Sequence, residues 1–245
     1  MKITKDYPGL RLAADGENRK KPFGDEYILT GDLASNNDII VEIDGVLIVL
    51  GNIVAKGSIT AENTKIVATE DIKAGGDIKV GGHILAEGKI EASGNIEVGG
   101  GIYSPATISA GKNIVVGDSV KGAVYIFAGG NIEVSGKVEA VGFIRAVEGN
   151  IFAGRGIKVL AAYIEAAGSI EAGESIEVVG NIKAGEYVKA TTYIDCGGSI
   201  FAGVSASLPS AKCDKSIICA ELRQGEICYG ELVITKNEAS TAESE

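Results

Sequence analysis

Residues 72–99 read IKAGGD IKVGGH ILAEGK IEASGN IEVG when they are written in blocks of six. Each block starts with isoleucine and carries alanine or valine two positions later. A spacing of two puts both side chains on one face of a short β-strand and the residue between them on the other face. The glycines near the end of most blocks permit the backbone angles of a tight corner. The stretch therefore predicts short strands that bend after every block.

The repeat continues well beyond this stretch. A branched aliphatic residue recurs from Ile53 to Ile200 at intervals of six, apart from single-residue insertions near residues 66, 151 and 164. Asparagine precedes that aliphatic at intervals of 18 or 19 residues, at Asn95, Asn113, Asn131 and Asn150. Three six-residue strands per coil of about 18 residues would stack these asparagines in a ladder. We therefore predict an all-β fold, a single-stranded parallel β-helix (solenoid) of triangular cross-section with a little over eight coils, and its handedness stays open.

Two further columns fit the same register. Tyr125, Phe143 and Tyr163 follow one another at 18 and 20 residues, which predicts an aromatic ladder along one corner. Charges of mostly alternating sign recur at outward positions, where neighbours on adjacent coils would support each other at about 4.8 Å. The residues of this charged column are Lys121, Glu139, Lys158, Glu177 and Asp195.

The flanks depart from the repeat. We predict an irregular N-terminal segment or cap over residues 1–30, the β-helix over 31–203, an irregular C-terminal coil or cap over 204–236 and a disordered tail over 237–245. Residues 31–50 read as two strands joined by a turn at Asp44-Gly45. An uncovered final coil would expose strand edges to another molecule, so the flanks decide whether the ends are closed.

Composition and charge exclude several classes of partner. The chain of 245 residues has a formal net charge of −10. Nucleic-acid binding needs clustered lysine and arginine, so we expect no nucleic-acid partner. The sequence contains no signal-peptide core and no apolar run near the ~20 residues that cross a bilayer, so we expect a cytoplasmic protein without membrane insertion.

The chemistry-bearing residues do not predict an enzyme. His83 is the single histidine and occupies a corner position, and the carboxylates alternate regularly with lysine as in a solvated face. Cys196, Cys213, Cys219 and Cys228 form no Cys-x-x-Cys pair, which favours buried or half-buried free thiols over a zinc site. We expect no catalytic, cofactor-binding or metal-binding residues.

The segments GDIKVGGHILAEGKIEASGNIEVGG (76–100) and GSIEAGESIEVVGNIKAG (168–185) resemble the bactofilins, a family of bacterial polymer-forming cytoskeletal proteins. The resemblance covers roughly residues 51–203. It implies a right-handed triangular β-helix that assembles end to end into nonpolar filaments without nucleotide. The repeat differs from that of the hexapeptide acyltransferases, in which the small residue follows the aliphatic by four positions.

These observations favour a noncatalytic structural or scaffolding protein that self-associates through its β-helix, with itself as partner. The alternative is a binding module, such as an adhesin or phage-fibre β-helix, that recognises carbohydrate or protein on a lateral face. Large apolar residues at outward positions are the candidates for self-association: Leu85, Tyr103, Phe127, Phe152 and Phe201.

Overall fold

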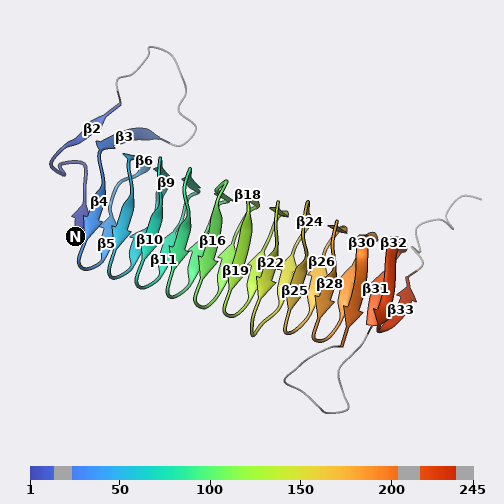
Figure 1. The fold of residues 1–245 in the computed structure, drawn as a ribbon. Coiled ribbons are helices and arrows are strands. Elements are labelled where there is room, and N and C mark those ends of the chain that lie inside the picture. The colour runs from blue at the N-terminus through green and yellow to red at the C-terminus, as the bar shows by residue number, and fades with distance from the viewer. Residues whose placement is uncertain (14–23, 204–215, 236–245) are drawn as a thin grey trace, which may run out of the picture.

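The structure is a computed structural model that describes residues 1–13, 24–203 and 216–235. This part of the chain contains strands and no helix, and the strands stack into one elongated solenoid (Figure 1). From β3 to β27 each strand pairs in parallel with the strand three positions later in the chain, so each coil contributes one strand to each of three faces. Near the N-terminus β2 pairs with β3 in antiparallel orientation. The predicted parallel β-helix is confirmed.

The three faces are numbered here, and along each coil the chain passes through face 2, then face 1, then face 3. Face 1 consists of β1 (Lys2–Ile3), β5 (Ile39–Val41), β8 (Ile59–Ala61), β11 (Ile78–Val80), β14 (Ile96–Val98), β17 (Ile114–Val116), β20 (Ile132–Val134), β23 (Ile151–Ala153), β26 (Ile170–Ala172), β29 (Val188–Ala190), β31 (Ser216–Cys219) and β33 (Glu231–Ile234). Face 2 consists of β4 (Leu33–Ser35), β7 (Ile53–Ala55), β10 (Ile72–Ala74), β13 (Ile90–Ala92), β16 (Thr107–Ala110), β19 (Tyr125–Ala128), β22 (Ile144–Ala146), β25 (Ile164–Ala166), β28 (Ile182–Ala184) and the second halves of β30 (Tyr193–Ala202) and β32 (Glu221–Tyr229). Face 3 consists of β2 (Leu10–Leu12), β3 (Asp25–Thr30), β6 (Gly45–Leu50), β9 (Thr64–Ala68), β12 (Ile84–Ala86), β15 (Ile102–Tyr103), β18 (Val120–Ala123), β21 (Val138–Ala140), β24 (Ile157–Val159), β27 (Ile176–Val178) and the first halves of β30 and β32.

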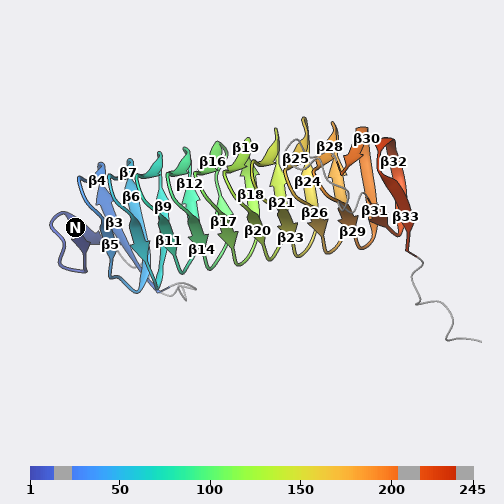
Figure 2. The ribbon, with the colours of Figure 1, turned by 90° about the horizontal axis from the view of Figure 1, so that it is seen from below.

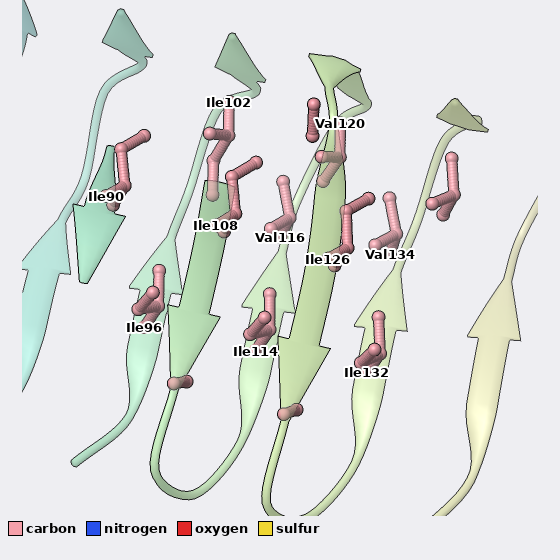
Figure 3. Packing of buried hydrophobic residues seen from close by; sticks show 14 of the residues in the cluster. Ile90, Ile96, Ile102, Ile108, Ile114, Val116, Val120, Ile126, Ile132 and Val134 are labelled. Atoms are coloured by element: carbon pink, nitrogen blue, oxygen red, sulfur yellow. The ribbon is translucent and has the colours of Figure 1, made fainter. Parts of the chain in front are cut away.

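The core is a set of stacked aliphatic rows. On face 1, for example, Ile96 pairs with Ile114 and Ile114 with Ile132, and all three side chains are fully buried. Figure 3 shows such residues from neighbouring strands pointing into the interior. Burying a large aliphatic side chain contributes about 1.5–3 kcal/mol, so these rows are the main source of stability.

Some corners require glycine because the coils lie so close together. A Cβ added to Gly81 would overlap the carbonyl oxygen of Glu62 on the preceding coil. Gly122 has a φ of 83°, in the left-handed region that favours glycine, and marks a bulge where the register between β18 and β21 shifts.

The regular stack extends further at both ends than the sequence predicted. Residues 24–30 belong to the predicted irregular segment, but β3 pairs with β6 in parallel over six residues. Residues 31–50 form three strands instead of two, and Asp44-Gly45 lies at the corner between β5 and β6. At the other end, where the sequence predicted an irregular coil or cap, β31, β32 and β33 continue the stack in parallel pairing (Figure 2).

Two of the predictions concern residues that lie outside the described ranges. The predicted tail over 237–245 lies outside the described residues, as does Cys213. Within the described ranges, no helix is long and apolar enough to cross a membrane.

Candidate functional site

The asparagine ladder is a chain of side-chain to backbone hydrogen bonds at the corner before face 1. The backbone N–H of Asn113 donates to Oδ1 of Asn95 at 3.2 Å, and that of Asn131 donates to Oδ1 of Asn113 at 2.8 Å. The N–H of Asn150 repeats the contact with Oδ1 of Asn131 at 2.8 Å. Each asparagine therefore satisfies a backbone donor of the next coil, which stabilises the corner.

This ladder is longer than the four asparagines identified in the sequence. Ser58, Asp77 and Ser169 occupy the same corner, and the N–H of Asn95 donates to Oδ1 of Asp77 at 2.6 Å. The N–H of Ser169 donates to Oδ1 of Asn150 at 2.7 Å. A search for any short side chain with an acceptor oxygen, rather than for asparagine alone, would have found these members. The ladder is a structural device because every contact that it makes is internal.

The aromatic ladder lies on the corner between face 3 and face 2. The ring of Phe143 stacks on Tyr125 with centroids 4.5 Å apart and on Tyr163 with centroids 5.4 Å apart. Since the rings cover one another's faces, mainly their edges remain for solvent or a ligand. The same corner also carries three exposed aliphatic side chains on successive coils: Val141, Leu160 and Val179.

The five candidates for self-association do not form one patch. Leu85 and Tyr103 are register neighbours on face 3. Phe127 and Phe201 both lie on face 2, but Arg145, Glu165 and Lys183 occupy the outward positions between them. Phe152 lies on face 1 between two glutamates. Only the pair on face 3 belongs to a larger apolar surface.

That surface lies on the same outward row of face 3 as the charged column, on the coils nearer to the N-terminus. From β3 to β15 the outward residues of face 3 that lie in one row with Lys121 are all apolar, and each is in register with the next. Glu26 on β3 and Lys65 on β9 lie beside this row on the same outward side. We name this set the apolar column: Ile28, Ile48, Val67, Leu85 and Tyr103. Tyr103 is 49% exposed and the other members are partly exposed. Only Leu85 and Tyr103 of this set were predicted from the sequence.

The charged half of face 3 is held together by its own contacts. Lys158 and Glu177 form an ion pair at 3.1 Å. The hydrogen bond to Glu177 raises the pKa of the Lys158 ammonium, and the hydrogen bond from the Tyr193 hydroxyl lowers the pKa of the Glu177 carboxyl. Arg223, from the last coil, lies 3.5 Å from the centre of the Tyr193 ring. These contacts fasten the last coil to the stack.

The C-terminal end of the solenoid is open. Within the described part of the chain, no strand pairs with the outer edges of β32 and β33. Leu232 and Ile234 lie in register with the buried Ile217 and Cys219, so they belong to the core rows, but they are 37% and 50% exposed. Two further core residues of this coil are only partly buried, namely Leu222 and Ile227.

The N-terminal end is covered. Residues 1–13 cross it: Ile3 of this segment is 0% exposed, and Leu33 on β4 is 1% exposed. Met1, Tyr7 and Leu10 pack against this core. The backbone of Ile40 and Glu42 donates to the carbonyl oxygens of Met1 and Ile3, which closes the edge of β5. The two ends of the solenoid therefore differ in kind.

The residues whose side chains could react or bind a metal, the histidine and the cysteines, are dispersed over the solenoid. The ring Nδ1 of His83 accepts a hydrogen bond from the N–H of Gly101 at 2.8 Å, so the histidine lies at a corner as expected. Cys196 and Cys219 are buried, whereas Cys228 is exposed, contrary to the expectation of buried or half-buried thiols. Burial raises the pKa of the Cys196 and Cys219 thiols, which disfavours the reactive thiolate.

No group of three or more potential metal ligands converges among the residues that the structure places. The features that stand out are instead an open end, an apolar half-face and an aromatic corner. Exposed apolar surfaces of this kind often contact other macromolecules. Comparison of the chain with protein-family models, with curated proteins and with solved structures finds no match.

Proposed function

We propose that this chain is a noncatalytic structural protein that self-associates end to end through its last coil. The observation that carries the proposal is the open C-terminal end. There none of the described strands pairs with the outer edges of β32 and β33, and the core residues Leu232 and Ile234 are exposed, although the same rows are buried in the coils below. Unprotected strand edges are templates for pairing with another chain.

The surface that fits this end best is the same surface of a second copy. A partner must satisfy strand edges on three faces at once and cover a core of the same cross-section, and another last coil does both. The covered N-terminal end presents no matching open core, so we propose a two-fold contact between C-terminal ends. Such a contact is isologous and closes on itself as a dimer.

The energy of this contact comes from completing the core. Full burial of leucine or isoleucine contributes about 1.5–3 kcal/mol, and burying only the exposed part contributes roughly 1 kcal/mol for each. The residues that would gain are Leu222, Ile227, Leu232 and Ile234. Hydrogen bonds between the strand edges add to this sum and offset part of the entropy lost on association. The resemblance of the repeat to the bactofilins supports a self-assembling scaffold as well.

The test compares inward and outward positions on β33. At low micromolar concentration we expect light scattering to report a dimer for the wild type and a monomer for Ile234→Glu. Val233→Glu is the matched control, because Val233 is 40% exposed and points outward from the same strand. This control should remain a dimer. Circular dichroism would establish that each variant keeps its β-structure.

Three results would contradict the proposal. They are a monomeric wild type at every concentration, a dimer that persists in Ile234→Glu, and equal loss of the dimer in both variants. A monomeric wild type would favour the binding-module alternative, in which a lateral face recognises another molecule.

A further inference from the structure

The apolar column divides face 3 into two halves of different character. Its five members occupy consecutive coils, and the next five outward positions, from Lys121 to Asp195, are all charged. Leu50, beside the column on β6, is 45% exposed and widens the apolar half. A run of exposed apolar side chains along a flat sheet is a typical contact surface.

Each end of the apolar column carries a cation. Arg11 on β2 lies opposite Ile28 and is exposed, and Lys121 follows Tyr103 at the other end. Glu139 comes one coil after Lys121 and forms no ion pair within 4.0 Å in the described ranges. The column thus has the order cation, five apolar residues, cation, anion.

These charges restrict how two copies could pack face to face. With the solenoid axes parallel, a two-fold axis would place Lys121 against its own copy and Glu139 against its own copy, and like charges in contact are unfavourable. With the axes antiparallel and Val67 at the centre, Arg11 would face Lys121. A shift by one coil removes this repulsion, because Arg11 then faces Glu139 at both ends of the contact.

We propose that two copies overlap in this shifted antiparallel arrangement, which we name the lap contact. Val67 of each copy lies against Leu85 of the other, and Ile48 lies against Tyr103. Ile28 covers the aliphatic stem of Lys121, whose ammonium can reach Glu26 on β3. The occupant of the apolar column is therefore a second copy of this chain.

The expected strength follows from the size of the overlap. Eight coils at about 4.8 Å and strands of about five residues give a flat footprint of roughly 550 Å² for each copy. A standard stable interface buries about 800 Å² for each partner. The lap contact alone should therefore form only at high micromolar concentration, well above the range in which the end contact forms.

The two contacts together have a consequence for assembly. An end contact pairs C-terminal halves and a lap contact pairs N-terminal halves, so every molecule can hold two neighbours and the chain of molecules has no polarity. This polymer rests on the proposed end contact. The lap contact itself does not, because it uses a different surface, and it can be tested without the end contact.

The test uses Ile234→Glu as the starting protein, since this variant lacks the end contact. Sedimentation velocity at increasing concentration should show a monomer–dimer equilibrium. Adding Val67→Glu should abolish the dimer, whereas adding Val115→Glu should not, because Val115 is an outward valine on face 1, away from the apolar column. Arg11→Glu or Glu139→Arg alone should weaken the dimer about tenfold, and the two together should restore most of the affinity.

Particular results would overturn the lap contact. It is wrong if the Ile234→Glu protein stays monomeric at the highest concentration, or if its dimer survives Val67→Glu with circular dichroism unchanged. If the double charge reversal fails to restore affinity, the proposed register is wrong. Val67→Glu in the otherwise natural chain should still form the dimer through its C-terminal ends, so failure of one proposal can be distinguished from failure of the other.

Discussion

Replacement of a central core isoleucine should cost several kilocalories per mole. Ile132 is 0% exposed and lies in register between Ile114 and Ile151. Ile132→Ala removes three carbon groups, which costs about 2.4 kcal/mol at about 0.8 kcal/mol each. The cavity adds to this loss, because neighbouring coils hold the surrounding backbone in place, and the total should reach about 3–4 kcal/mol. Urea unfolding followed by circular dichroism measures it.

Two controls separate packing from other effects. Val115→Ala, next to the core residue Ile114 but 40% exposed, should cost less than about 0.5 kcal/mol. Leu232→Ala, made in the Ile234→Glu protein so that no end contact covers the site, should cost about 1 kcal/mol because the Leu232 side chain is 37% exposed in the open coil. Since coils couple mainly to their neighbours, the central defect should also broaden the transition. A cost for Ile132→Ala below 1 kcal/mol, or equal to that of Leu232→Ala, would refute this view of the core.

Three further predictions follow from the contacts at corners and at the last coil. Asn113→Ala should lower the free energy of unfolding by about 1 kcal/mol, because the N–H of Asn131 loses its acceptor. Asn113→Ser should cost less, since the Ser58 hydroxyl accepts the equivalent hydrogen bond at the same corner. Equal urea midpoints for the two variants would contradict this role of the ladder. In a Cys213→Ser background, maleimide should label Cys228 rapidly and Cys196 and Cys219 only on unfolding, as mass spectrometry can show; fast labelling of two or more thiols in the folded protein would be inconsistent with the burial. The hydrogen bond from Tyr193 lowers the folded pKa of Glu177, so its stabilisation is complete above the ordinary value near 4.5 and disappears as the pH falls through the lower folded value. Tyr193→Phe should therefore reduce stability at pH 7 by less than about 1 kcal/mol, and this loss should shrink as the pH is lowered further and further below 4.5. A loss that does not change with pH would exclude this cause.

The fold could be predicted from the sequence because each of the two intervals in the repeat has a direct structural cause. An interval of two separates inward from outward residues, and an interval of about 18 brings equivalent corners together. Both survive single-residue insertions, since an extra residue fits into a corner without changing the strand. The stacking of Tyr125 on Phe143 was predictable for the same reason.

The ends of the solenoid and the apolar column could not be predicted from these two intervals. The strand GVLIVL (45–50) is apolar throughout, so alternation no longer tells which residues face outward. Ile48 was therefore not recognised as an outward residue. The dispersal of Phe127, Phe152 and Phe201 over two faces depends on counting strands across every insertion, which composition and local pattern do not do.

The distance along the chain between paired residues determines how this protein can form during synthesis. Residues such as Ile96 and Ile114 pair across 18 positions, and the same interval recurs throughout the central coils. A new coil can therefore fold onto the previous one as soon as it leaves the ribosome, with low contact order and without waiting for distant segments. Because Met1 and Ile3 already cover the first edge, coils are added in one direction, from β5 toward β33.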